Sequence, residues 1–143
     1  MPFEYLSDIA GGDVAFRAWG STFEEMIIAA GDATMGVMVG DPDTVVQREE
    51  REIEVEDGGE DLLLVQVLQE LLFYKDAQSL LLRLSEGKVS RSQGVSRFTG
   101  KATGERIDSE RHHLSTDVKA VTMHHLAVKR TERGWEGTVV LDV

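Results

Sequence analysis

The sequence predicts an α+β fold, a single domain over residues 1–143 in which two helices pack on a mainly antiparallel sheet, or sheets, of about six strands. Three observations support this prediction. Only two segments carry helical signals and most of the strands are joined by hairpins, so the sustained strand–helix alternation that builds a parallel sheet is missing. The second half of the chain holds four strand-like runs. Finally, 143 residues with 41% hydrophobic content can fill one core but are too few for two comfortable ones.

The first predicted elements are a strand and a helix. Residues 13–19 (D-V-A-F-R-A-W) alternate apolar and other side chains, as a half-buried strand does. A capping box from Ser21 to Glu24 then predicts a helix start, and the helix is expected to reach about Val39, before the G-D-P-D break. Its methionines at helical spacing are predicted to fill the core rather than to line a flexible binding groove. They are Met26, Met35 and Met38.

A strand and a second helix follow. In the strand predicted over residues 45–55, Ile53 and Val55 face inward while the intervening glutamates face water. After a D-G-G-E turn, the leucine-rich run over residues 61–74 is too long for a surface strand. It predicts a largely buried helix that ends near residues 75–76.

Four strand-like runs make up the rest of the chain. They cover residues 79–85, 95–102, 117–129 and 135–143. The T-E-R-G segment at 131–134 predicts a hairpin turn between the last two runs. Residues 105–116 show no clear period, which predicts an ordered loop.

Composition narrows the classes of function. A formal net charge of -11 repels phosphate backbones, so direct nucleic-acid binding is not expected and a basic protein or a cation is favoured as partner. No apolar run approaches the roughly 20 residues that a membrane span needs. The first residues lack the features of a signal peptide, which predicts a cytoplasmic protein. The absence of cysteine excludes disulfides and thiol catalysis.

Known catalytic fingerprints are missing, and the histidines do not predict a zinc site. The chain has no phosphate-binding G-x-x-x-x-G-K-[ST], no G-x-S-x-G and no H-E-x-x-H. Its four histidines form two adjacent pairs, at 112–113 and 124–125. Neighbouring residues on a strand point to opposite faces, so His124 and His125 are not expected to bind one ion. One should pack in the sheet while the other faces solvent.

Carboxylates at strand ends are better candidates. Asp13 opens a strand, and Asp142 closes another beside the α-carboxylate of Val143. If these ends meet, their oxygens suit Ca²⁺, Mg²⁺ or Mn²⁺. The alternative, acidic residues that simply face water, is favoured when composition alone is considered. Lys119 has apolar neighbours; such a lysine usually extends to solvent, but it can also reach a phosphate or a partner's carboxylate.

Motifs along nearly the whole chain resemble those of the archease family. The segments that carry the resemblance, in order, are D-V after G-G at 11–14, V-L-Q-E-L-L-F-Y-K-D-A-Q-S-L-L at 67–81, G-E-R-I-D at 104–108, D-V-K-A-V-T-M-H at 117–124 and W-E-G-T-V-V-L-D-V at 135–143. The departures cluster in the first motif. There, I-A-G-G replaces the family's D-H-T-A, so only Asp13 carries over and the role of Asp8 stays open.

The resemblance implies an accessory protein rather than an enzyme. Archeases assist RtcB-type RNA ligases: they promote guanylylation of the ligase's active-site histidine and multiple turnover in tRNA splicing and RNA repair. The family's divalent-metal site, which takes calcium, manganese or magnesium, maps to Asp13, Asp142 and the Val143 carboxylate. Lys119 is then expected to face nucleotide or partner, with His124 as an orienting residue. The resemblance thus reverses the preference for water-facing acids.

Two other classes of function stay open. A small metal-dependent phosphohydrolase could be built on the same carboxylates, although no general base is evident beside them. A general chaperone or modulator of nucleic-acid-processing proteins would instead have several unrelated partners.

Overall fold

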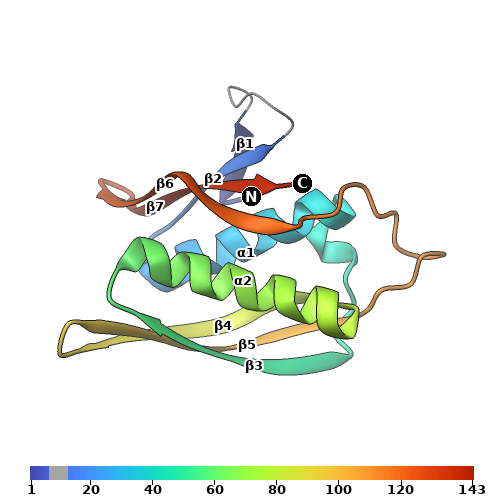
Figure 1. Ribbon diagram of the computed structural model, residues 1–143, viewed down its shortest axis with the longest axis horizontal. Helices are drawn as coiled ribbons and strands as arrows, with labels where there is room; N and C mark the ends of the chain where they lie inside the picture. The colour runs from blue at the N-terminus through green and yellow to red at the C-terminus, as the bar shows by residue number, and fades with distance from the viewer. Residues whose placement is uncertain (7–12) are drawn as a thin grey trace.

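Two antiparallel sheets enclose both helices in the computed structural model, which describes residues 1–6 and 13–143 (Figure 1). The first sheet has the order β1-β2-β7-β6, with bounds Phe3–Leu6, Val14–Gly20, Gly134–Asp142 and Ala120–Thr131. The second sheet has the order β3-β5-β4, with bounds Glu49–Asp57, Val95–Arg106 and Leu80–Ser92. Helices α1 (Phe23–Val39) and α2 (Glu60–Gln78) lie between the sheets, and a 3₁₀ turn, η1 (Pro42–Thr44), follows α1. The predicted α+β class is confirmed.

Helix α1 begins one residue later than the sequence predicts. The N-cap is Thr22, whose Oγ1 accepts a hydrogen bond from the Glu25 amide at 3.1 Å. Glu25 reaches back to accept from the Ser21 amide at 2.9 Å. The capping box is therefore shifted by one residue, because Thr22 and Glu25 repeat the spacing of Ser21 and Glu24. The helix ends at Val39, as predicted.

Helix α1 is largely buried because it packs against both sheets. Because α1 contacts both sheets, its methionines are core residues, with Met26 and Met35 fully buried and Met38 3% exposed. This confirms the prediction of core filling. Helix α2 ends at Gln78, two residues beyond its predicted end, and Ser79 caps it in a left-handed conformation (φ 56°).

The second sheet is longer than predicted because of one tight hairpin. Strands β4 and β5 continue to Ser92 and Val95, which pair directly across a two-residue turn. The turn residues Gln93 and Gly94 have φ values of 53° and 78°, both in the left-handed region that a two-residue hairpin favours. In the middle of the sheet, a Cβ on Gly104 would lie 1.7 Å from the carbonyl oxygen of Leu81. Only glycine fits there, which explains the G in G-E-R-I-D.

Strand β1 was not predicted. It pairs with β2 at the edge of the first sheet, and its Tyr5 hydroxyl donates to the Ala33 carbonyl of α1 at 2.7 Å. Strand β3 begins at Glu49, four residues after its predicted start, because Val45 caps η1 and the Val46 amide donates to the Glu105 side chain instead of to a neighbouring strand. The predicted alternation holds there: Ile53 is buried and its glutamate neighbours are exposed.

The second half of the chain follows the predicted order. Strand β6 ends at Thr131 and β7 begins at Gly134, which confirms the predicted hairpin turn. Residues 107–119, here called the crossover segment, connect β5 in the second sheet to β6 in the first (Figure 1). No helix in the described part of the chain is long and apolar enough to cross a membrane.

Candidate functional site at the strand ends of the first sheet

Three strand ends meet at one corner of the first sheet. Strand β2 begins with a Val14–Leu141 pair, and the same register places Asp13 opposite Asp142. On the other side of β7, Asp142 pairs with Ala120, the first residue of β6. We call the group formed by Asp13, Lys119, Asp142 and Val143 the strand-end corner. The predicted convergence of Asp13 and Asp142 therefore follows from the strand register.

The two aspartates share the face of the sheet that points away from the helices. Leu141 is fully buried in the core, and successive strand residues point to opposite faces, so Asp142 points outward. Directly opposed residues lie on the same face, which places Asp13 beside it. Asp142 is exposed and Asp13 half-buried, while the Val143 side chain packs against the core. The corner thus presents carboxylates to the surface on an apolar base.

Lys119 is attached to the same corner through its backbone. Its amide donates to the Asp142 carbonyl at 2.8 Å, which extends the β6–β7 ladder by one bond. The side chain is exposed. The backbone hydrogen bond brings the main chain of Lys119 beside Asp142, so this lysine is a candidate for contact with an anion or with a partner's carboxylate at the corner.

The residue that holds this corner to the core, Lys75, is not among the site residues that the sequence predicts. Lys75, in the last turn of α2, has a side chain only 5% exposed. Its ammonium donates to Asp117 Oδ1 at 2.5 Å and to the Val118 carbonyl at 2.8 Å, and it pairs with Asp76 at 2.8 Å. Because Asp117 and Val118 directly precede Lys119, Lys75 fixes the end of the crossover segment.

The ion pairs also decide the protonation of Lys75. Burial alone would lower the pKa of Lys75, but its hydrogen bonds to Asp117 and Asp76 and the charges of both carboxylates raise the pKa above its ordinary value. Lys75 is therefore charged at neutral pH. Its position was detectable from periodicity, since it falls four residues after Leu71 and seven after Leu68, both on the buried face of α2.

A second buried cluster closes the other end of the crossover segment. Glu105 Oε2 accepts from the Val46 amide at 2.6 Å and lies 3.2 Å from Nε2 of the buried His112. His112 Nδ1 accepts from the Asp108 amide at 2.8 Å, so Nε2 carries the proton that faces Glu105. Burial and the charge of Arg111 lower the pKa of His112. This histidine is structural and neutral.

The other predicted site residues lie elsewhere. His124 is in an irregular part of β6. Asp8 and the G-G pair at 11–12 lie outside the described residues. The expectation that His124 and His125 point to opposite faces is wrong. The register shifts between Thr122 and Ala127, both histidines are exposed, and their ring centroids are 4.0 Å apart. The alternation argument fails because these residues do not follow regular strand geometry.

The donor chemistry of the corner fits a hard divalent cation. Among the described residues, no group of three or more His, Asp or Glu side chains is placed to hold an ion. The corner offers two aspartates, and the main chain of Val143 follows Asp142 as the expected source of a third oxygen ligand. Such an all-oxygen set suits Ca²⁺, Mg²⁺ or Mn²⁺ rather than zinc.

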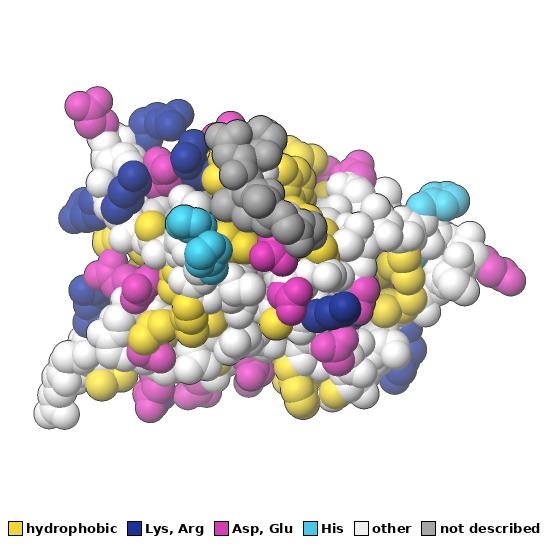
Figure 2. Space-filling model, turned by 45° about the horizontal axis from the view of Figure 1, so that its top comes forward, with side chains coloured by type: hydrophobic (Ala, Val, Ile, Leu, Met, Phe, Trp, Pro, Cys, Tyr) yellow, Lys and Arg dark blue, Asp and Glu magenta, His cyan; other side chains and the backbone are white. Residues whose placement is uncertain are grey.

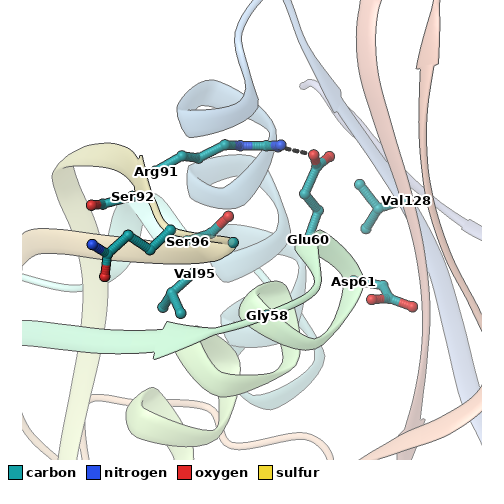
Figure 3. Close-up of a pocket in the computed structure, with 10 residues that line it drawn as sticks. Gly58, Glu60, Asp61, Arg91, Ser92, Val95, Ser96 and Val128 are labelled. Carbon is teal, nitrogen blue, oxygen red and sulfur yellow. Dashed lines mark ion pairs between the residues drawn. The ribbon is translucent and has the colours of Figure 1, made fainter.

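A separate pocket of about 610 Å³ lies at the start of α2 (Figure 3). Arg91 and Glu60 point toward one another across it and form an ion pair, while Asp61 adds a second carboxylate. The arginine is thereby neutralised, so this pocket is poorly suited to a phosphate. Since the 19 residues of α2 span about 28 Å, the pocket is far from Lys75 and the strand-end corner.

The sequence and the fold have counterparts in known proteins. The model of the Archease protein family (MTH1598/TM1083) matches residues 3–143. The chain belongs to the archease family. It is 35% identical over 143 residues to the protein archease of Methanopyrus kandleri, with 100% of both chains covered. It is also 35% identical over 134 residues to that of Pyrococcus abyssi, with 92% of both covered.

Solved structures agree with this family assignment. The solution structure of Methanobacterium thermoautotrophicum protein 1598 is similar, with a TM-score of 0.85, 31% identity and 99% of each chain covered. An archease from Thermotoga maritima, described as a possible chaperone, shares the fold with a TM-score of 0.55 at 15% identity, covering 90% of this chain and 89% of that one. The expected archease membership is confirmed.

Proposed function

We propose that this archease is a non-enzymatic activator of an RtcB-type RNA ligase, promoting guanylylation of the ligase and its multiple turnover in tRNA splicing and RNA repair. Family membership over residues 3–143 supports the proposal. The observation that carries it is the register that brings Asp13, Asp142 and Lys119 to one exposed corner. These are the residues onto which the family's functional motifs map.

In this proposal, Asp13, Asp142 and the Val143 carboxylate hold a divalent cation: calcium, manganese or magnesium. When bound, such an ion neutralises and orients phosphate oxygens. Lys119 supplies a point charge at the rim of the corner for a phosphate or a carboxylate of the ligase. His124, on the same strand, is a further candidate for contact with nucleotide or partner. Lys75 keeps Lys119 in place by holding the Val118 carbonyl.

A role without turnover agrees with the surroundings of the carboxylates. The residues that pair next to the two aspartates are Val14, Leu141 and Ala120. None of these three described residues can act as the general base that a phosphohydrolase needs. An activator requires only that the corner bind and orient.

The charge of the chain supports a basic protein partner. A net charge of -11 attracts a positively charged surface, such as the RNA-binding face of a ligase, and accelerates encounter. Salt screens this attraction over about 10 Å at 0.1 M. The protein concentration that gives half-maximal activation should therefore rise between low and moderate salt. An unchanged concentration would contradict electrostatic steering but would not bear on the role of the strand-end corner.

The test is ligase guanylylation under multiple-turnover conditions, with no addition, the wild-type chain, Asp142→Ala or Glu52→Ala. Glu52 is an exposed carboxylate on the second sheet, so its loss matches the change in charge. Stimulation by the wild type and Glu52→Ala, but not by Asp142→Ala, is expected. Equal stimulation by all three chains would keep the ligase as partner and reject the metal-bearing corner.

Two further outcomes would point to the other classes of function. Hydrolysis of nucleotides or phosphate esters by the chain alone would indicate an enzyme. Capture of several unrelated nucleic-acid-processing proteins, with no effect on the ligase, would indicate a general chaperone.

A further inference from the structure

The most irregular backbone in the first sheet lies in β6. Thr122 pairs with Val140 and Ala127 with Thr138, so four residues of β6 oppose Val139 alone. We call these residues, Met123–Leu126, the β6 bulge. Three of them are exposed, including Met123 at 56%. Bulges re-aim side chains away from the positions that a regular strand would give them.

The bulge has a defined conformation. His125 adopts a left-handed backbone with φ 55°, which is uncommon for a residue other than glycine. Thr122 anchors the start of the bulge: its hydroxyl donates to the Val140 carbonyl at 3.1 Å and accepts from the His124 amide at 3.2 Å. A residue held in a sparsely populated conformation by its surroundings is a reason to look for function.

The consequence is that two neighbouring imidazoles lie side by side. Their centroids are 4.0 Å apart and their planes are inclined by 54°. Figure 2 shows a pair of neighbouring histidine side chains, in cyan, on the outer face of the molecule. An ion with metal–nitrogen bonds of about 2.0–2.1 Å needs its two ligand nitrogens roughly 3 Å apart. Two rings at the observed centroid distance can provide that separation by small side-chain rotations.

We propose that His124 and His125 form a binding site for a borderline divalent metal ion such as Zn²⁺, Ni²⁺ or Cu²⁺. Imidazole suits these ions, whereas Ca²⁺ and Mg²⁺ prefer oxygen ligands. No third His, Asp or Glu of the described residues joins the pair, so solvent completes the coordination. The site differs in donor chemistry from the strand-end corner, and it does not depend on the proposed action on a ligase.

The other histidine pair provides an internal comparison. His112 is buried, with both ring nitrogens engaged by Asp108 and Glu105, so it has no nitrogen to offer to an ion. His113 is exposed next to it. Adjacent histidines in this chain therefore form a site only where the bulge turns both rings outward.

The experiment is a titration of the full chain with Zn²⁺ against a chromophoric chelator, in excess Mg²⁺ to occupy oxygen sites. The variants are His124→Ala, His125→Asn, His113→Ala and Asp142→Asn. Asparagine accepts a left-handed backbone, so His125→Asn keeps the bulge while removing the ligand. One Zn²⁺ per chain is expected, with affinity falling at least tenfold in His124→Ala and His125→Asn but unchanged in His113→Ala and Asp142→Asn.

Three results would overturn the proposal. The wild-type chain and His125→Asn could bind Zn²⁺ equally well, the wild type could bind no Zn²⁺, or Asp142→Asn alone could abolish binding. The last result would assign the zinc to the strand-end corner. Circular dichroism of each variant verifies that the fold is retained.

Discussion

Replacing Lys75 by methionine tests how the crossover segment is held to the core. Methionine keeps the length and apolar character of the lysine stem, so the core contacts of α2 are retained. The change removes the hydrogen bonds to Asp117 and to the Val118 carbonyl and the ion pair with Asp76. Any loss of stability therefore reports on the ammonium group itself.

The size of the loss follows from the exposure of each partner. The Asp117 and Asp76 side chains are 69% and 61% exposed, so both stay hydrated without the lysine and contribute little. The Val118 carbonyl, beside a fully buried side chain, loses its charged donor, at a cost of about 1–3 kcal/mol. We expect destabilisation of about 2 kcal/mol. With an unfolding entropy of roughly 0.3 kcal/mol/K for 143 residues, this lowers the Tm by about 7 °C.

The assay is chemical and thermal denaturation of the wild type, Lys75→Met and Lys88→Met. Lys88 is exposed and forms no ion pair within the described residues, so its substitution should change stability by less than about 0.5 kcal/mol. If Lys75→Met were as stable as Lys88→Met, the ammonium group would not anchor the segment and the account of how Lys119 is positioned would fail.

Three further predictions concern pH, packing and the chain end. The pKa of His112 is lowered, so below about pH 6.5 the unfolded chain takes up a proton that the folded chain does not. The free energy of unfolding should then fall more between pH 7.5 and 5.5 in the wild type than in His112→Gln. An equal fall in the two chains, measured by chemical denaturation at each pH, would contradict this. Gly104→Ala forces a Cβ against the Leu81 carbonyl and should cost at least about 2 kcal/mol, whereas Gly58→Ala, whose Cβ meets nothing closer than 3.9 Å, should be nearly neutral. Extending the chain past Val143 replaces a charged carboxylate by an amide carbonyl and should weaken calcium binding at least tenfold by calorimetry; equal affinities would remove Val143 from the site.

Local patterns in the sequence were sufficient for the class of fold and for most elements. Helix α1 has a cap and a break, the β6–β7 turn has its glycine, and β3 alternates cleanly. Strand β1 was missed because Phe3–Leu6 is too short to show a period, and it is specified by pairing with β2 instead. The shared placement of both helices between two sheets also depends on contacts between distant segments, which no local pattern encodes.

The candidate site, too, can be predicted from the sequence only in part. Asp13, Asp142 and Lys119 were found because motifs mark them, and the register explains why they meet. No motif marks Lys75, and the sequence places it only near a helix end, although its spacing from the leucines puts it on the buried face. The prediction that His124 and His125 point to opposite faces is wrong because the alternation rule assumes a regular strand. A bulge depends on how β6 pairs with β7 and not only on the residues of β6.

The most direct test of the central claim measures ligase guanylylation at multiple turnover with Asp13→Asn, Lys119→Met and Asp142→Asn compared side by side. Because these residues act together at one corner, each substitution should remove most of the activation, and combining any two should remove little more. Glu52→Ala should retain wild-type activation. Full activation by all three single variants would show that the strand-end corner is not where this archease acts on its ligase.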